Sequence, residues 1–331
     1  MKPLRALLCL LLLAVAAAVG GAAWWLNRPL DLAAESVEVS IELGTPPRDI
    51  AQAWVQAGVK ASPLLLYEWF RWSGQSRKIR AGSYEIGAGV TPMALLNKMV
   101  RGDETLAVVR LIDGWTFRQF RAELAKADGL KPLTANMTDE QLMQSIGASG
   151  VMPEGRFHPD TYAYSKGSSD VAVLKRAYRA MQKRLDAAWQ ERAADSPLRT
   201  PDDALVLASI VEKETGVGSD RGRVAGVFVN RLRIGMPLQT DPTVIYGLGT
   251  AFDGNLRKRD LLTDTPYNTY LRAGLPPTPI AMPGKAALLA AVHPESTKAL
   301  YFVARGDGSS EFSETLADHN RAVNRYQRRS K

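Results

Sequence analysis

The start of the chain is its longest apolar run. Leu4 to Leu26 carries one charge, Arg5, and is otherwise apolar or small. A run of this length is enough to cross a bilayer as an α-helix. Basic residues precede it and two tryptophans close it at Trp24 and Trp25, a pattern typical of a retained anchor whose N-terminus lies inside. We therefore expect residues 1–28 to form a cytoplasmic tip and a single-pass transmembrane anchor.

A cleaved signal peptide is the alternative interpretation of this run. Small residues between Ala14 and Ala23 offer a cleavage site. Both interpretations export the rest of the chain. With the anchor retained, we expect a single-pass protein of the cell inner membrane whose exported part is periplasmic.

Residues 37–106 show the periodicities of a small α+β unit. Val37 to Leu43 alternates between apolar and polar positions, as a half-buried strand does. Helical spacing follows, with Pro or Gly at the boundaries, and Arg80 to Ile86 indicates a turn leading into a second strand. The predicted order is β, α, α, β, α, with helices over 48–58, 62–72 and 91–102. No catalytic constellation is evident in this unit.

Residues 107–331 predict a mixed α+β domain, which makes the whole chain α+β. A strand over 106–112 leads into it, and a hairpin is expected from 300–304 and 311–313. Residues 235–243 indicate an extended polar segment, and 264–279 indicates loops over a cleft, because it is rich in Thr, Pro, Tyr and Asn. Helices are expected over 116–127, 138–146, 170–195, 204–215, 219–233, 283–292 and 316–328.

Charge and composition limit the partners and the kinds of site that the chain is expected to have. The net charge is +8, and apart from a recurrence over Arg71 to Arg80 and near the C-terminus the basic residues are scattered, so no nucleic-acid partner is expected. The single cysteine, Cys9, lies in the apolar run. The three histidines are far apart in the sequence, so neither a metal site nor a cofactor is expected.

Carboxylates are the remaining candidates for catalysis. On a helix over 204–215, Leu207, Ile210, Val211 and Glu214 share one apolar sector, whereas Glu212 falls on the far side. Burial of an unpaired carboxyl raises its pKa and keeps it protonated, as a general acid must be. Glu214 is therefore the preferred acid.

The pattern leaves other roles open. Glu214 could instead end its helix in an ion pair with Arg221 or Arg223. The pattern also does not exclude Glu154, Asp160 or Asp241 as the acid.

Several motifs stand in order along the second half of the chain. They are Leu207–Thr215, Val227–Leu232, Leu238–Gly247, Thr265–Tyr270 and Gly274–Ile280. Together they resemble the MltG (YceG-like) family of endolytic murein transglycosylases. The similarity extends from the anchor to the hairpin at 300–304 and to His319-Asn320.

This resemblance implies a site and a reaction. The family's catalytic acid is the second glutamate of Glu-Lys-Glu-Thr, which is Glu214 here. It would cleave the β-1,4 bond between MurNAc and GlcNAc and leave a 1,6-anhydro-MurNAc end, and residues 37–106 would be a LysM-like peptidoglycan-binding module. The expected contacts to sugar or to the acid are Asn230, Gln239, Thr240, Asp241, Tyr267, Asn268 and Tyr270.

The implied partners are peptidoglycan glycan strands and, within the family, peptidoglycan synthases, and the implied role is to terminate nascent strands. Two other functions remain as alternatives. A water-using muramidase would need a second acid, for which Asp241 is the best candidate. A non-catalytic peptidoglycan-binding scaffold would need no buried acid.

Overall fold

The computed structural model describes residues 2–42, 44–215 and 218–328, and the chain divides into two compact units. Unit 1 is the chain through Val108 together with Asp128–Lys131 and Ala163–Ser168. Unit 2 comprises Val109–Ala127, Pro132–Tyr162 and the chain from Ser169 onward. The functional domains expected over residues 1–28, 37–106 and 107–331 stay a prediction, because the division into compact units does not assign a function to either unit.

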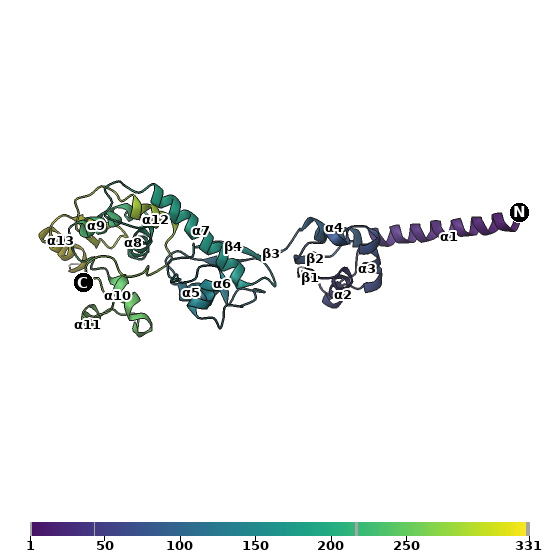
Figure 1. The fold of residues 1–331 in the computed structure, drawn as a ribbon, viewed down its shortest axis with the longest axis horizontal. Coiled ribbons are helices and arrows are strands. Elements are labelled where there is room, and N and C mark those ends of the chain that lie inside the picture. Colours follow the sequence, from purple (N-terminus) through teal and green to yellow (C-terminus); the bar gives the residue numbers. More distant parts are fainter. Residues whose placement is uncertain (1, 43, 216–217, 329–331) are drawn as a thin grey trace. The chain divides into compact units, whose positions relative to one another are not determined.

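Unit 1 has the predicted β, α, α, β, α order after its N-terminal helix (Figure 1). Strands β1 and β2 pair antiparallel, with Val39 opposite Tyr84. Trp54, Leu66, Phe70 and Tyr84 are fully buried in its core. Its elements are α1 (Lys2–Asn27), β1 (Ser36–Ile41), α2 (Pro47–Ala57), α3 (Pro63–Trp72), the 3-10 helix η1 (Ser76–Lys78), β2 (Gly82–Gly87) and α4 (Pro92–Arg101).

The boundaries of these helices follow from local chemistry. Thr91 accepts a hydrogen bond from the N–H of Ala94, and Pro92 occupies the first turn of α4, where a missing N–H costs nothing. Gly102 closes α4 with a φ of 72°, which glycine adopts without strain. The last residue of the predicted first strand, Leu43, lies outside the described residues.

Strand β3 (Leu106–Leu111) pairs with β4 (Asp160–Ser165) in a separate two-stranded sheet. Each of these strands begins in one unit and ends in the other. The sequence did not predict β4.

Unit 2 is mainly helical and contains the predicted hairpin, which is followed by α13 and η3. The sequence predicted an extended segment through residue 243 and no element for residues 244–248, but residues 241–248 form the helix α10. Its elements are α5 (Phe117–Leu124), α6 (Asp139–Ser145), α7 (Asp170–Gln190), α8 (Pro201–Glu214), α9 (Arg221–Arg233), α10 (Asp241–Leu248), η2 (Gly249–Ala251), α11 (Lys258–Leu261), α12 (Lys285–Val292), β5 (Tyr301–Ala304), β6 (Ser310–Ser313), α13 (Leu316–Val323) and the π-helical turn η3 (Asn324–Arg328).

Helix α8 is the centre of the unit 2 core. Thr200 caps it in a capping box with Asp203, and Pro201 follows at its first position. Every residue from Ala204 to Val211 is buried, and helices α7, α9 and α12 pack around it. We expected α8 to have one apolar and one polar face. This was wrong in part, because Ser209 is as buried as Leu205 and Leu207.

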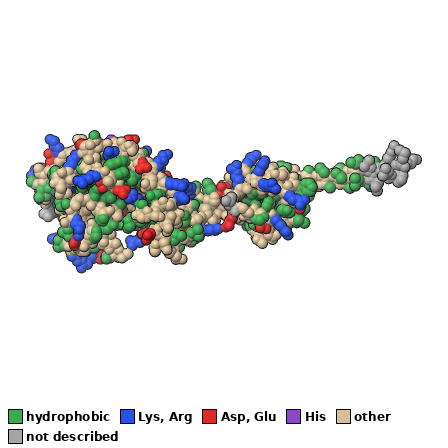
Figure 2. All heavy atoms as spheres, in the orientation of Figure 1, with side chains coloured by type: hydrophobic (Ala, Val, Ile, Leu, Met, Phe, Trp, Pro, Cys, Tyr) green, Lys and Arg blue, Asp and Glu red, His purple; other side chains and the backbone are tan. Residues whose placement is uncertain are grey.

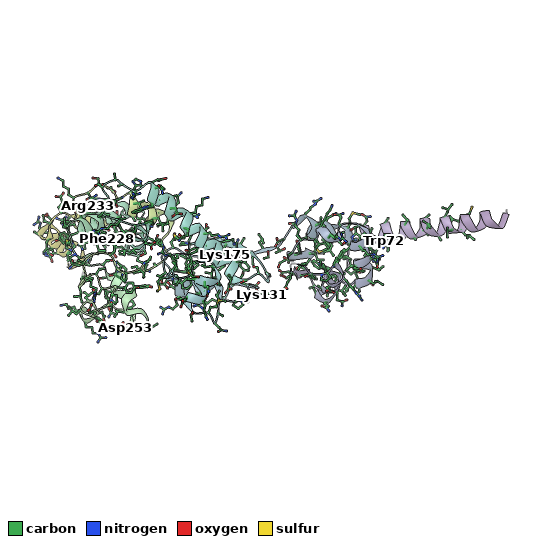
Figure 3. The ribbon with its side chains drawn as sticks, viewed as in Figure 1. Trp72, Lys131, Lys175, Phe228, Arg233 and Asp253 are labelled. Atoms are coloured by element: carbon green, nitrogen blue, oxygen red, sulfur yellow. The ribbon has the colours of Figure 1, made fainter. Side chains whose placement is uncertain are left out.

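Helix α9 approaches the chain that leads to the hairpin very closely. Phe228, labelled in Figure 3, packs from α9 against Phe302 of β5 with ring centroids 5.9 Å apart. On the same helix, a Cβ placed on Gly226 would lie 2.6 Å from the carbonyl oxygen of Glu295. Glycine is required here by this backbone approach and not by its φ angle.

The substitution Gly226→Ala should therefore destabilise unit 2 by about 2 kcal/mol, as overpacking does, although alanine is the better helix former. The free energy of unfolding from urea denaturation of the detergent-solubilised chain measures this. Gly222→Ala is the matched control, because its added Cβ would come no closer than 3.4 Å to any neighbour. A Gly226→Ala protein as stable as the control would contradict the argument.

Candidate active site

Glu214 is the last residue of α8, and its carboxyl group is partly buried. The hydroxyl of Thr240 donates a hydrogen bond to its Oε2 at 2.9 Å. Within the described residues Glu214 makes no ion pair, so this hydroxyl is the contact that fixes the carboxyl. The alternative in which Glu214 pairs with Arg221 or Arg223 is not observed, because the Arg221 guanidinium lies 3.8 Å from Glu212 and the Arg223 guanidinium lies 3.7 Å from Glu295.

The surroundings of Glu214 favour its protonated form. Burial is the largest influence and raises the pKa of its carboxyl, and the negative charge of Asp241 acts in the same direction. The hydrogen bond from Thr240 and the positive charge of Arg231 act in the opposite direction. The net result is a raised pKa, the direction that a group must show to hold a proton near neutral pH.

Thr240 is itself held by two further buried threonines. The N–H of Thr240 donates to Oγ1 of Thr269 at 3.1 Å, and the hydroxyl of Thr243 donates to the carbonyl of Thr240 at 2.7 Å. The two hydroxyls of Thr243 and Thr269 are 2.8 Å apart. Thr240 is therefore fixed from both its backbone N–H and its carbonyl.

The residue before Thr240 has an unusual backbone. Gln239 has a φ of 47°, which non-glycine residues seldom adopt. Its N–H donates to the carbonyl of Thr269 at 3.0 Å, and its side chain is exposed. This conformation turns the chain into α10 directly beside Glu214, and strained residues of this kind are concentrated at functional sites.

Asp241 and Tyr270 form a second polar pair beside Glu214. The Tyr270 hydroxyl donates to Oδ1 of Asp241 at 2.6 Å. Burial raises the pKa of Tyr270, and the negative charges of Asp241 and Glu214 raise it further. Asp241 is exposed in the first turn of α10, where the helix dipole favours a carboxylate. Thr240, Asp241 and Tyr270, all predicted from the resemblance, are thus brought together around Glu214.

Two of the predicted contact residues have their side-chain amides bound to backbone. Asn268 is fully buried and donates to the carbonyls of Leu261 and Thr263. Asn230 donates to the carbonyls of Thr297 and Ala299 at 2.8 and 3.1 Å. The structure thus uses both amides to hold loops, and their role as sugar contacts stays a prediction.

Arg231 is the site residue that the sequence analysis missed. It is buried, and its guanidinium donates to the carbonyls of Leu238 and Leu300, both at 2.7 Å. It therefore ties the segment before Thr240 to the hairpin while placing positive charge near Glu214. The sequence feature that could have identified Arg231 is its position beside Asn230 within the Val227–Leu232 motif.

Glu212, the other glutamate of the motif, has a structural partner. Its side chain is only 9% exposed, and Oε2 accepts a hydrogen bond from the N–H of Gly284 at 2.9 Å. Burial raises its pKa as well, so a raised pKa alone does not single out Glu214. The difference is geometric, because Glu212 is held against the start of α12 and Glu214 faces Thr240 and the Asp241–Tyr270 pair.

A cavity of about 1170 Å³ lies along α10 in unit 2, and its lining includes Lys213 and Pro242, the chain neighbours of Glu214 and Asp241. Tyr246 and Tyr267 line it with their rings edge to face, their centroids 4.8 Å apart. Glu154 also lines it and accepts hydrogen bonds from the N–H of Phe117 and the hydroxyl of Tyr246. The predicted residue Tyr267 therefore belongs to this cavity and is not a neighbour of Glu214 in any hydrogen bond of the described residues.

The remaining carboxylates that the sequence left open lie apart from Glu214. Glu154 is buried, which raises its pKa from 4.5 to about 7. Asp160 is exposed at the start of β4, and its Oδ1 accepts from the N–H of Thr161. No group of His, Cys, Asp and Glu able to hold a metal ion occurs among the residues that the structure describes.

Glu154 should make the stability of unit 2 depend on pH. Because its pKa is raised on folding, its contribution is fully present below pH 4.5 and is lost as the pH rises to about 7. Glu154→Gln stays neutral throughout, so its stability relative to the parent should rise by about 3 kcal/mol across that window. Urea denaturation at a series of pH values tests this, with exposed Glu191→Gln as the control. A constant difference between Glu154→Gln and the parent would refute it.

The chain has relatives of known name along most of its length. The YceG-like family model matches residues 39–325. A Bacillus subtilis protein named endolytic murein transglycosylase is 30% identical over 310 residues, covering 88% of this chain and 85% of that protein. A Streptococcus pneumoniae protein of the same name is 26% identical, covering 89% of this chain but 59% of its own length.

A solved structure agrees with the fold. The crystal structure of a YceG-like protein from Listeria monocytogenes is 28% identical, covers 87% of this chain and 98% of its own, and superposes with a TM-score of 0.53. The family match extends over most of the chain and includes the segments that carry Glu214, Thr240 and Tyr270. The chain belongs to the YceG-like family.

Proposed function

We propose that this chain is a lytic murein transglycosylase and that Glu214 is its single acid–base catalyst. The observation that carries the proposal is a partly buried carboxyl with a raised pKa, held by one hydroxyl and facing a polar pair at the start of α10. The names of its relatives supply the substrate class, which is peptidoglycan.

The proposed reaction needs only one carboxyl group. Glu214 gives its proton to the oxygen between MurNAc and GlcNAc as the bond from that oxygen to C1 breaks. The resulting carboxylate then takes the proton of the MurNAc 6-hydroxyl as the 6-oxygen bonds to C1. A 1,6-anhydro-MurNAc end and a GlcNAc end result, no water is consumed, and Glu214 is protonated again.

The neighbours of Glu214 have supporting roles in this scheme. The carboxylate of Asp241 stabilises positive charge that develops at C1, and Tyr270 holds Asp241 in place through the 2.6 Å hydrogen bond. The exposed side chain of Gln239 is free to contact sugar hydroxyls. The cavity along α10 receives a further part of the strand, with the rings of Tyr246 and Tyr267 offering apolar faces.

The same proposal includes a membrane location. Helix α1 contains one apolar stretch, Cys9–Asn27, long enough to span a bilayer. Lys2 and Arg5 before it favour a cytoplasmic N-terminus, so we propose that unit 2 and the part of unit 1 that follows α1 lie in the periplasm of a cell with an inner membrane. We infer that the enzyme cuts nascent strands beside peptidoglycan synthases and terminates their elongation, with residues 37–106 as a LysM-like module that binds peptidoglycan.

A water-using muramidase is the second candidate, and one observation favours it. Asp241 is an exposed carboxylate near Glu214 and could activate a water molecule as a second acid–base group. A non-catalytic scaffold is the third. The products of the reaction distinguish all three.

Glu214→Gln should lower the rate of strand cleavage by roughly 1000-fold, because glutamine cannot give a proton. Purified glycan strands are digested with parent and variant, and the ends are identified by mass spectrometry. Anhydro ends support the lyase, reducing ends support the muramidase, and uncut strands with the parent support the scaffold. Exposed Glu191→Gln is the control, and full activity in Glu214→Gln would remove Glu214 from the catalytic role.

Thr240→Val should change both the rate and its pH dependence. The hydroxyl of Thr240 lowers the pKa of Glu214, so its loss raises that pKa further. Activity that needs protonated Glu214 falls as the pH rises through this pKa, so the fall should move to higher pH. Loss of the orienting bond should also lower kcat about tenfold.

A pH–rate profile measures both effects of Thr240→Val. Thr240→Ser keeps the hydroxyl and should retain the parent profile. An unchanged alkaline limb in Thr240→Val would show that the hydrogen bond does not act on the catalytic acid.

A further inference from the structure

Helix α3 of unit 1 presents an apolar face to solvent. Leu64, Leu65 and Trp72 are 64%, 52% and 77% exposed, whereas Leu66 and Phe70 of the same helix are fully buried. Leu65 and Trp72 are seven positions apart, so they project in nearly the same direction from points two turns, about 10 Å, apart along the helix. Glu68 lies on the turn between them and accepts a hydrogen bond from the Trp72 indole N–H at 3.0 Å. Large exposed apolar side chains grouped on one short helix in this way indicate an interaction site.

Basic side chains accompany this apolar face. Between Pro63 and Arg80 the chain carries four basic residues, Arg71, Arg77, Lys78 and Arg80, all exposed, and one acidic residue, Glu68. Basic side chains are frequent on the visible face of this unit (Figure 2). The surface is therefore both apolar and positively charged, which matches an anionic and partly apolar partner.

Hydrogen bonds place α3 close to the end of α1. The N–H of Leu30, three residues beyond α1, donates to the carbonyl of Val90 at 2.8 Å. The indole N–H of Trp69 in α3 donates to the carbonyl of Pro92 at 3.1 Å. Both bonds end within three consecutive residues at the start of α4, so α3 and the end of α1 are fixed to the same point of unit 1.

Very little chain separates α1 from the core of unit 1. Trp25, in the last turns of α1, packs against the core, and Leu30 is already part of it. Trp72 lies at the end of the unit from which α1 leaves (Figure 3). A bilayer crossed by α1 would therefore meet this end of unit 1.

We propose that the exposed face of α3 lies in the headgroup region of the bilayer that α1 crosses. Leu64, Leu65 and Trp72 enter the boundary between headgroups and acyl chains, and the basic residues from Arg71 to Arg80 bind anionic phosphates. Tryptophan favours this boundary, and apolar helices with basic neighbours bind anionic lipid surfaces. The proposal rests on the membrane anchor of the proposed function and is independent of its catalytic part.

The test uses the full chain with Cys9→Ser and a nitroxide label on Leu64→Cys, reconstituted in nanodiscs of phosphatidylcholine and phosphatidylglycerol. The matched label site is Arg48→Cys, which is also exposed but begins α2. Arg48 lies about 14 Å along α2 from Ala57 at the other end of the helix, and the chain beyond Ala57 leads to Val59, which pairs with Leu32 near α1. Collision rates with oxygen, which enters lipid, and with a water-soluble nickel chelate give the depth of each label.

The label at position 64 should show a several-fold higher ratio of oxygen to nickel collisions than the label at position 48. Arg77→Glu with Lys78→Glu should move the label at 64 toward the aqueous value, as should discs of phosphatidylcholine alone, whereas Arg48→Glu should not. Equal ratios at the two positions would overturn the proposal while leaving the anchor intact. A chain that does not enter nanodiscs at all would overturn the anchor and this proposal together, and strand cleavage in solution would still report on the catalytic part.

Discussion

The burial of α8 is the constraint on which unit 2 depends. Eight consecutive residues of this helix are buried, so it cannot shift or rotate without disturbing the helices around it. Glu212 and Glu214 follow at its last turn, where the core ends. The packed core therefore fixes the positions of both carboxyl groups. That of Glu212 is held by the start of α12, and that of Glu214 faces Thr240.

The other side of the site is assembled from loops, and polar contacts to backbone replace apolar packing there. Arg231 and Asn230 reach from α9 to carbonyls on both sides of the site, and Asn268 closes its own loop in the same way. Loops have few apolar side chains to bury, so charged and amide donors fix their course. This explains why Asn230, Arg231 and Asn268, whose polar side chains are typical of a binding site, instead hold the loops around the site in place.

The sequence predicted most of the helices because the residue types at their ends, such as proline, threonine and glycine, identify helix boundaries without knowledge of the tertiary structure. Pro63 and Trp72 bound α3 as expected, and Thr91, Pro92 and Gly102 define α4. Helix α10 was missed because it is eight residues long and its polar start looks like a loop. Strand β4 was missed because β3, with which it pairs, is distant in sequence. Glu214 followed from helical spacing, whereas Arg231 did not, since an arginine between Asn230 and Leu232 near the end of a helix is expected at the surface until the carbonyls that bind it are known.

The contact between Thr240 and Glu214 has a consequence for the catalytic cycle. A hydroxyl can donate to a carboxylate and, after rotating about its C–O bond, can accept from a carboxylic acid. The same side chain can therefore hold Glu214 in the same place before and after each proton transfer. An arginine or a backbone N–H at this position could only donate, so it could not accept a hydrogen bond from the protonated carboxyl. With a threonine there, the carboxyl is free to change its charge twice in each turnover without losing its neighbour.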